Sequence, residues 1–331
     1  MFQPQRHRRL LLGTLALLGL APLAHAQDTP WPSKPITLIV PFSPGGGVDV
    51  MARLLAEKMK VALGQPVNVE NKAGGSGMIG VLAAVRSPAD GHTLVMATAG
   101  ETAINPHVFK SRMQYQPERD LAPVTLVVKV PNAVVVNPAL PIRSIADLIG
   151  YAKANPGKIS YGSSGIGNPQ HLAGELLEVM SGQPLRHVPY RGASNQLTDV
   201  AGGSLDMTFV SLGGARAFIK DQRVRAIGIT SARRSDLAPE LPAVAETAGL
   251  AGYVLENWFG LFAPSATPPA VVTKLNGIVT QALKDPELVK RLHDLGGDPA
   301  PMSPTEFRSF IQSESARFAR IVEQAKVTPE N

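Results

Sequence analysis

The sequence predicts a two-domain α/β protein whose mostly parallel sheets are covered by helices on both faces. Short β-branched segments alternate with segments of helical period along most of the chain. The candidate strands outnumber what one sheet comfortably holds, which favours two domains. The chain has 331 residues, 44% hydrophobic and 18% charged, a globular composition with length for two domains of ordinary size.

Residues 1–26 have the pattern of a secretory signal peptide. Arginines among the first nine residues precede an apolar run at 10–20, and the A-x-A cleavage pattern follows at 24–26. A membrane anchor is the alternative, but spanning a bilayer needs about 20 apolar residues. The pair Arg8-Arg9 leaves a twin-arginine signal as a further alternative to ordinary secretion. We therefore expect an exported, soluble mature chain.

The candidate strands are short apolar runs rich in β-branched residues. In chain order they are Ile36–Val40, Val67–Glu70, Thr93–Ala97, Val124–Val128, Ala133–Val136, Ile159–Gly162, Arg186–Pro189, Met207–Val210, Arg225–Thr230 and Leu255–Phe262.

Helices between these strands are indicated by apolar spacing and by capping residues. Apolar residues at three- and four-residue spacing over 50–59 predict the first helix. Ser144 is expected to cap a helix that continues through Ala154, and Asn168 is expected to cap another. The sequence 303–306 (SPTE) is a capping box that begins the last long helix.

Composition excludes several functional classes. The chain has no cysteine, so disulfides, thiolate nucleophiles and cysteine-ligated metals are excluded. The formal net charge is +6, and the arginines of the signal peptide supply part of it. The remainder is too small for a nucleic-acid footprint, and no basic stripe carries interleaved aromatic residues. We expect no nucleic-acid partner.

Three glycine-rich loops, at residues 41–49, 71–77 and 162–168, each follow a candidate strand and precede a candidate helix. In open α/β sheets, ligands bind outside the carboxyl ends of the strands. Glycine allows close backbone approach, and the first amides of the following helix are unpaired at the positive end of its dipole. The loops therefore favour a small anion; glycines that serve only tight turns are the alternative.

Residues for catalysis or metal binding are poorly placed. Residues 75–80 fit the dinucleotide pattern G-x-G-x-x-G, with Glu101 about twenty residues further on, but this loop follows the second strand rather than the first. No G-x-S-x-G motif occurs, and the histidines lack metal-ligand spacing. His171 is either a ligand contact or a packing residue. We expect no cofactor, no metal and no catalytic residue.

A set of short segments in a fixed order resembles the substrate-binding proteins of the tripartite tricarboxylate transporter system, the Bug family. The matching segments are 31–36 (WPSKPI), 41–46 with Asp49 (PFSPGG), 70–75 (ENKAGG), 90–94 (DGHTL), 103–106 (AINP), 161–165 (YGSSG), 171–176 (HLAGEL), 188–192 (VPYRG), 202–206 (GGSLD), 258–261 (WFGL) and 263–268 (APSATP).

The resemblance implies a two-lobed periplasmic binding protein of the type II-like class, with the ligand between the lobes. Lobe 1 would comprise residues 27–127 and 258–331, and lobe 2 residues 128–257, with crossovers near 124–131 and 255–260. The implied activity is capture of a small carboxylate or amino-acid-like ligand, without chemistry, for membrane permease subunits. We expect a monomer. The alternatives are a periplasmic sensor for the same ligands and a secreted hydrolase or dinucleotide-dependent enzyme.

The resemblance also carries over a set of ligand-binding positions. These are Phe42, Ser43, Gly46, Gly47 and Asp49 from lobe 1, then Ser163, Ser164, Gly165 and Asn168 from lobe 2, with Ala193 and Asp206 as further members. His171 joins the expected site through its place in the first turn of the helix that Asn168 caps, facing the third loop. Asp49 would act as a cap or as an acceptor from a ligand amine or hydroxyl group.

The loop after Thr93–Ala97 departs from the family pattern of small hydroxyl residues. It contributes Thr98, Gly100 and Glu101 to the expected site. If the Glu101 carboxylate faces the ligand, it favours a cationic or hydrogen-bond-donating ligand group; the alternative is that Glu101 points to solvent.

Overall fold

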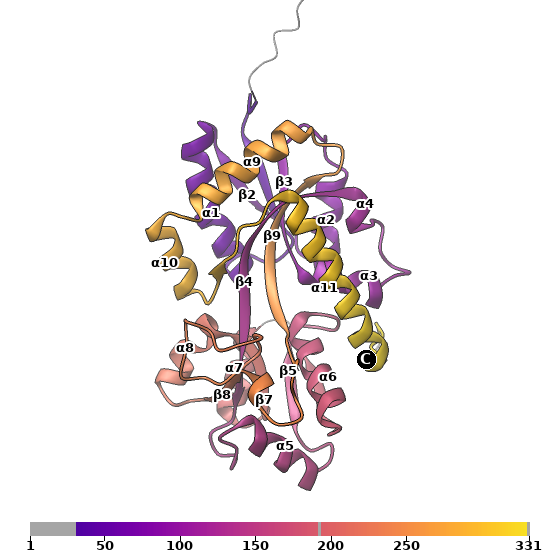
Figure 1. The fold of residues 1–331 in the computed structure, drawn as a ribbon, viewed down its shortest axis with the longest axis vertical. Helices are drawn as coiled ribbons and strands as arrows, with labels where there is room; N and C mark the ends of the chain where they lie inside the picture. Colours follow the sequence, from indigo (N-terminus) through magenta and orange to yellow (C-terminus); the bar gives the residue numbers. More distant parts are fainter. Residues whose placement is uncertain (1–30, 191–192, 330–331) are drawn as a thin grey trace, which may run out of the picture.

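The computed structural model describes residues 31–190 and 193–329. The predicted signal peptide, residues 1–26, lies outside the described residues. The molecule is elongated, with one lobe above the other in the view of Figure 1. No helix in the described part of the chain is long and apolar enough to span a membrane.

Lobe 1 begins with three parallel strands whose helices cover the sheet. Its first elements are β1 (Ile36–Val40), α1 (Gly47–Leu63), β2 (Val67–Asn71), η1 (Gly75–Gly77), α2 (Met78–Val85), β3 (Thr93–Thr98), the π-helical segment η2 (Gly100–Ile104), α3 (Asn105–Val108) and α4 (Pro117–Asp120). The strands β1, β2 and β3 pair in parallel, with β1 in the middle.

Lobe 2 repeats the parallel strand-helix arrangement on a smaller scale. Its elements are α5 (Ile145–Ala154), β5 (Ser160–Ser163), α6 (Pro169–Ser181), β6 (Arg186–Pro189), α7 (Ala193–Gly202), β7 (Met207–Ser211), α8 (Leu212–Lys220), β8 (Arg225–Ile229) and η3 (Val244–Glu246). The strands β6 and β7 flank β5 and run parallel to it.

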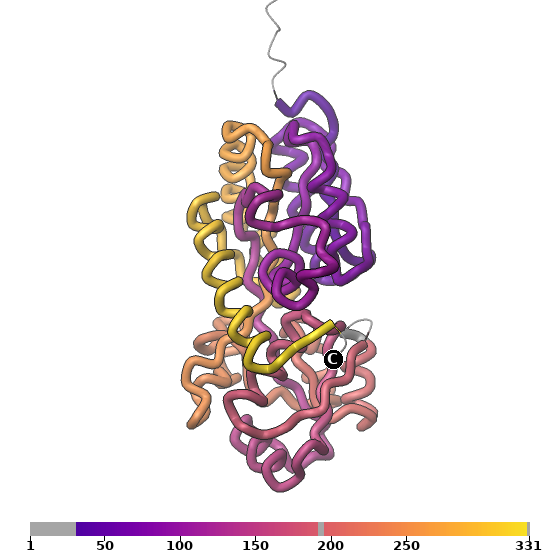
Figure 2. The backbone as a smooth tube through the Cα atoms, turned by 90° about the vertical axis from the view of Figure 1, so that its right-hand side faces the viewer, coloured from indigo at the N-terminus to yellow at the C-terminus, as the bar shows by residue number. Residues whose placement is uncertain are grey.

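The chain then returns to lobe 1. The returning elements are β9 (Glu256–Pro264), α9 (Pro269–Ala282), α10 (Pro286–Asp294), β10 (Asp298–Pro299) and α11 (Pro304–Gln324). Helix α11 packs against η2 of lobe 1 and reaches α6 of lobe 2, so it lies along both lobes (Figures 1 and 2).

One strand, β4 (Leu121–Val136), runs through both lobes. Its residues 121–131 pair with β9 in lobe 1, and residues 132–136 pair with β7 in lobe 2. The sequence reads as two strands, 124–128 and 133–136, because Pro131 and Asn132 interrupt the apolar run. The structure corrects this: the ten strands form one hydrogen-bonded sheet among the described residues, since β4 continues between the lobes.

The strand directions bring two sets of carboxyl ends toward each other. Strand β4 runs from lobe 1 to lobe 2 and is antiparallel to both β9 and β7. Because β3 is antiparallel to β9, strands β1, β2 and β3 run toward lobe 2. Strands β5 and β6 share the direction of β7 and therefore run toward lobe 1. The loops after both sets lie where the lobes meet.

The helix caps predicted from sequence are confirmed. Ser144 accepts a hydrogen bond from the Asp147 amide, and Asn168 accepts from the amides of Gln170 and His171. Ser303 and Glu306 form the expected capping box at the start of α11. Each cap pairs amide groups that the first helical turn leaves without a partner.

Candidate ligand-binding site between the lobes

The two facing edges are separated by a short length of β4. Thr98, at the end of β3, lies level with Val128 of β4 through Phe259 of β9. Ser211, at the end of β7, pairs with Asn132. Four residues of strand span about 13 Å. The two edges therefore lie about 13 Å apart along β4.

The part of the first loop that precedes α1, residues 41–46, is held in place by a buried carboxylate. Asp49 is 2% exposed and accepts hydrogen bonds from the Gly45 amide at 2.9 Å, from the Arg53 guanidinium and from the Asn71 side chain at 2.8 Å. Burial alone would raise the pKa of Asp49, but these hydrogen bonds lower it on balance. Asp49 therefore shapes the loop, and its carboxylate is not free to meet a ligand.

Asn71, the first residue of the second loop (residues 71–77), also joins that loop to the first one. Its amide donates to the carbonyl of Phe42 at 3.0 Å. Ser43, Gly46 and Gly47 are exposed above this support, whereas Phe42 is half-buried. In the sequence, Asn71 stands out only as part of the matching segment 70–75, so its role in joining the two loops was not predicted.

The segment after β3 is interior. Thr98 and Gly100 are buried, and the Gly100 amide donates to the Thr98 hydroxyl at 3.1 Å. Glu101 is 1% exposed and accepts from the Thr98 amide at 2.7 Å. The alternative, that Glu101 points to solvent, is wrong, because its side chain is buried. Burial raises the pKa of Glu101 to about 7.

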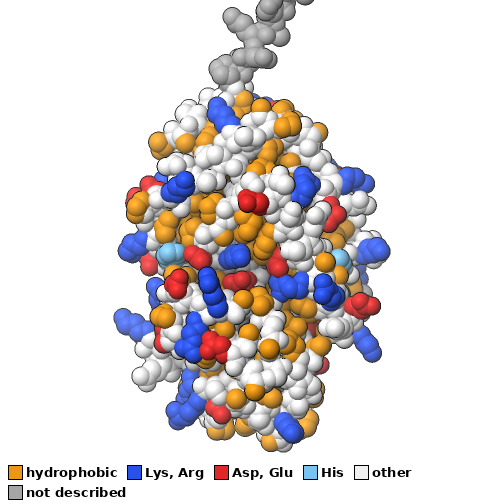
Figure 3. All heavy atoms as spheres, in the orientation of Figure 1, with side chains coloured by type: hydrophobic (Ala, Val, Ile, Leu, Met, Phe, Trp, Pro, Cys, Tyr) orange, Lys and Arg blue, Asp and Glu red, His pale blue; other side chains and the backbone are white. Residues whose placement is uncertain are grey.

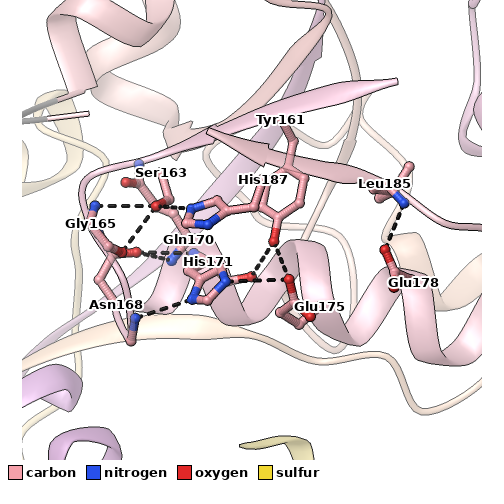
Figure 4. A network of polar contacts seen from close by, with 11 residues as sticks. Tyr161, Ser163, Gly165, Asn168, Gln170, His171, Glu175, Glu178, Leu185 and His187 are labelled. Carbon is pink, nitrogen blue, oxygen red and sulfur yellow. Dashed lines mark hydrogen bonds and ion pairs between the residues drawn. The ribbon is translucent and has the colours of Figure 1, made fainter. Parts of the chain in front are cut away.

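On lobe 2, the third loop, residues 162–168, is held by a polar network (Figure 4). The Ser163 hydroxyl lies 2.6 Å from Nε2 of His187 and bonds the backbone of Gly165. At the other end of the loop, the Gly167 amide donates to Nδ1 of His171 at 3.1 Å, and Asn168 caps α6. The rings of His171 and His187 stack with centroids 3.9 Å apart.

The environment of His171 shows whether it is a ligand contact or a packing residue. His171 is 1% exposed, and its Nε2 lies 3.3 Å from Glu175. Since Nδ1 accepts from the Gly167 amide, the proton is assigned to Nε2, which faces Glu175. Glu175 also accepts from the Tyr161 hydroxyl at 2.6 Å. His171 is a buried support of the third loop.

His187 was missed as a member of this network, since no spacing in the sequence links it to Ser163. It is half-buried. Burial lowers its pKa to about 4; the nearby His171 acts in the same direction and Glu175 opposes both. A neutral imidazole therefore bonds Ser163 near neutral pH.

Two glutamines, also missed, position Ser164 at the exposed tip of the third loop. The Ser164 amide donates to Gln170 at 2.8 Å, and its hydroxyl accepts from Gln196 at 2.9 Å. Gln196 is fully buried and accepts from Thr208 at 2.6 Å. Gln170 follows the capping Asn168-Pro169 pair, whereas no local signal indicates Gln196.

The last two expected site residues, Asp206 and Ala193, lie in different places relative to the facing edges. Asp206 precedes β7 and binds the amide and hydroxyl of Ser160, at 2.7 and 2.6 Å, at the start of β5. The structure therefore does not bring Asp206 to the third loop, which begins at the other end of β5. Ala193 is the first residue of α7, which follows β6 at the facing edge; its side chain lies outside the described residues.

Helix N-termini gather where the edges face. Helices α1, α2, α6, α7 and α8 each follow a strand end or its loop there. The positive dipole ends of these helices favour an anion, although Asn168 already pairs the first amides of α6 and Ser211 pairs the Gly214 amide of α8. Among residues 31–190 and 193–329, no cluster of three or more histidine, aspartate or glutamate side chains could hold a metal ion. Figure 3 shows positive and negative side chains interspersed on one face of the molecule.

Residues 51–327 match the family model described as tripartite tricarboxylate transporter family receptor. The chain belongs to this family. This confirms the family resemblance, and with it the fold of a periplasmic binding protein with a mostly parallel sheet flanked by helices.

Similar proteins include BugT of Bordetella pertussis, which is 34% identical over 310 residues that cover 94% of each chain. Among solved structures, Rpa4515 of R. palustris with adipate is 35% identical, with a TM-score of 0.83 over 90% of this chain and 99% of that one. MatC of Rhodopseudomonas palustris with bound malate is 29% identical, with a TM-score of 0.78 over 88% and 99%. The family and these neighbours are solute-binding proteins.

Proposed function

We propose that this receptor captures a small carboxylate between its two lobes and delivers it to the membrane subunits of a tripartite tricarboxylate-type transporter. The observation that carries the proposal is the pair of facing edges, about 13 Å apart along β4, each lined by helix N-termini. A dicarboxylate can place one anionic group at each edge. The adipate and malate of the two similar solved proteins are dicarboxylates, which supports this ligand class.

Recognition would depend on backbone amides more than on charged side chains. The Gly45 and Ser164 amides donate to Asp49 and Gln170, and these bonds hold the exposed backbone around them in place before the ligand arrives. Prealigned donors lower the ordering cost of binding. Micromolar affinity needs about 8 kcal/mol, which a few charge-assisted hydrogen bonds out of water can supply.

Capture requires the lobes to move, and the structure suggests where they contact. A Cβ on Gly167 of the third loop would lie 3.2 Å from the Phe109 ring of lobe 1. A Cβ on Gly296 of lobe 1 would lie 2.6 Å from the Gly213 amide nitrogen of lobe 2. A ligand that bonds both edges favours the closed arrangement by its differential contacts, and that arrangement would dock on the permease.

The first test is to identify the ligand. Mass spectrometry of the denatured, purified protein would reveal a retained acid, and calorimetry with adipate, malate, citrate and aspartate would rank the candidates. We expect saturable binding of at least one acid and no product. Absence of binding to every acid, or the appearance of a product, would overturn the proposal.

A variant in the first loop tests whether the ligand binds there. Gly46 has φ −74°, and its nearest neighbour to an added Cβ is the Ser43 carbonyl at 3.6 Å, so valine fits without backbone strain. Gly46→Val should weaken binding at least tenfold, because its methyl groups cover the first amides of α1. Gly150→Val, in open space on α5, is the matched control. Equal affinity of both variants would remove the first loop from the site.

Transport is tested separately in cells. Deletion of the gene should abolish uptake of the identified acid, and the wild-type chain should restore it. Normal uptake combined with a lost transcriptional response to the acid would instead favour a sensor.

A further inference from the structure

Glu101 is a carboxyl group buried at the edge of lobe 1 without a cationic partner. The Thr98 amide donates to its Oε2 at 2.7 Å, whereas the Tyr115 hydroxyl donates to the backbone carbonyl of Glu101 at 2.9 Å. Among the described residues, no lysine, arginine or histidine forms an ion pair with it. Burial without a counter-charge favours the neutral acid over the carboxylate.

The elements packed against η2 offer no compensating charge. Strand β3, η1 and α2 carry no ionisable side chain. On the remaining elements, His107 of α3 bonds Ser315, Arg119 of α4 pairs with Asp120, Arg317 of α11 pairs with Glu314, and Glu118 and Arg308 line a cavity of about 140 Å³ together with Thr102. Tyr115 is the ionisable neighbour, and burial raises its pKa far above neutrality.

Glu101 lies directly behind the exposed second loop. A Cβ on Gly77 would lie 2.5 Å from Oε1 of Glu101, so only glycine fits between the loop and the carboxyl group. The neighbouring Gly75 and Ser76 are exposed. The loop backbone at Gly77 therefore separates the Glu101 carboxyl group from the surface at this edge of lobe 1.

We propose that Glu101 takes up a proton from solvent when the receptor captures a carboxylate ligand. This inference rests on the proposed function and deepens it, since it makes capture proton-linked. Two negative charges close together in a medium of low dielectric disfavour each other. The ligand therefore shifts Glu101 toward its neutral form: an O–H bond forms on the carboxyl group, and the buffer supplies the proton.

The sign of the proton exchange identifies the ligand group at this edge. Burial already raises the pKa of Glu101 to about 7, so about half of the molecules carry the proton at pH 7 before the ligand binds. A carboxylate beside Glu101 completes the protonation. An ammonium group at the same place would instead stabilise the carboxylate and release a proton.

Calorimetry in buffers of different ionisation enthalpy counts these protons. Adipate and malate would be titrated into the mature protein at pH 7 in phosphate and in Tris. We expect uptake of about half a proton for each ligand bound. We also expect affinity to fall by up to about tenfold per unit as the pH rises from 7.5 to 8.5, because the free receptor must then regain the proton.

Glu101→Gln removes the titration and keeps an oxygen that can accept from the Thr98 amide. Its proton uptake should be near zero and its affinity independent of pH in this range. Glu118→Gln, the same change at an exposed glutamate of the adjacent α4, is the matched control and should behave as the wild type.

Wild-type measurements alone remain decisive if the Glu101 variant does not fold. Binding with no proton uptake, or with proton release, overturns the inference and leaves the proposed function standing. Uptake that persists in Glu101→Gln also overturns it. No heat with any acid of the panel overturns the proposed function itself, which is a distinct outcome.

Discussion

The loops on the two facing edges are held in chemically different ways. In lobe 1, the first loop rests on a charged group, Asp49, paired with Arg53. In lobe 2, the third loop rests on neutral imidazole and amide groups, among them His187 and Gln170. An ionised support is sensitive to loss of its partner, whereas a neutral support is sensitive to gain of a proton. The loops of the two edges should therefore lose their supports under different conditions: the first loop when Asp49 loses its partner, and the third loop when His187 gains a proton.

The largest expected effect follows from removing the charged support. Asp49→Ala leaves the Gly45 amide and the Asn71 side chain without their acceptor and should lower the free energy of unfolding by about 4 kcal/mol. Urea denaturation at pH 7 measures this. Asp147→Ala, which alters a fully exposed first-turn carboxylate of α5, is the control and should change much less. If both variants lost the same free energy of unfolding, Asp49 would not be the main support of the first loop.

The second prediction concerns the stability of lobe 1 at alkaline pH. The pKa of Glu101 is raised from 4.5 to about 7, so the native state retains a proton that the unfolded chain loses. Stability contributed by neutral Glu101 is full below pH 4.5 and is lost as the pH rises through 7. Glu101→Gln should therefore gain about 3 kcal/mol relative to wild type between pH 4 and pH 8.5. If the urea midpoints of wild type and Glu101→Gln differed by the same amount at every pH, the raised pKa of Glu101 would be contradicted.

The smallest of the three effects appears in lobe 2 under acid conditions. The pKa of His187 is lowered from 6.5 to about 4, so stability is full above 6.5 and is lost as the pH falls through 4. Because His187 is partly exposed, we expect a loss of about 2 kcal/mol. His187→Gln should flatten this acid limb, whereas His293→Gln, on the surface of α10, should not. Thermal unfolding between pH 3.5 and 7 measures both.

Local signals predicted much of the fold. Strands β1 and β6 have the predicted boundaries, because short β-branched runs and their flanking turns are encoded locally. Capping at Ser144, Asn168 and Ser303 depends on side chains within three residues of the amides they bond. The continuity of β4 was missed because Pro131 and Asn132 usually end strands, and here pairing partners on both sides keep them extended.

The candidate site was only partly accessible to sequence reasoning. The loops were found, since glycine-rich turns after strands are a local pattern. The supports were not, because Ser163 and His187 are 24 residues apart and Ser164 and Gln196 are 32 apart. The inward turn of Glu101 depends on the glycine at position 77, which no pattern in the segment after β3 indicates.

The passage of β4 and β9 between the lobes has a mechanical consequence. The connection is a ribbon of paired backbone, with register shifts near Pro123 and Leu126 and with Pro131 opposite Glu256 at its last pair. Bending of such a ribbon is distributed over many backbone dihedral angles, rather than concentrated at one hinge residue. A ligand that drew the two lobes together would therefore bend the whole ribbon.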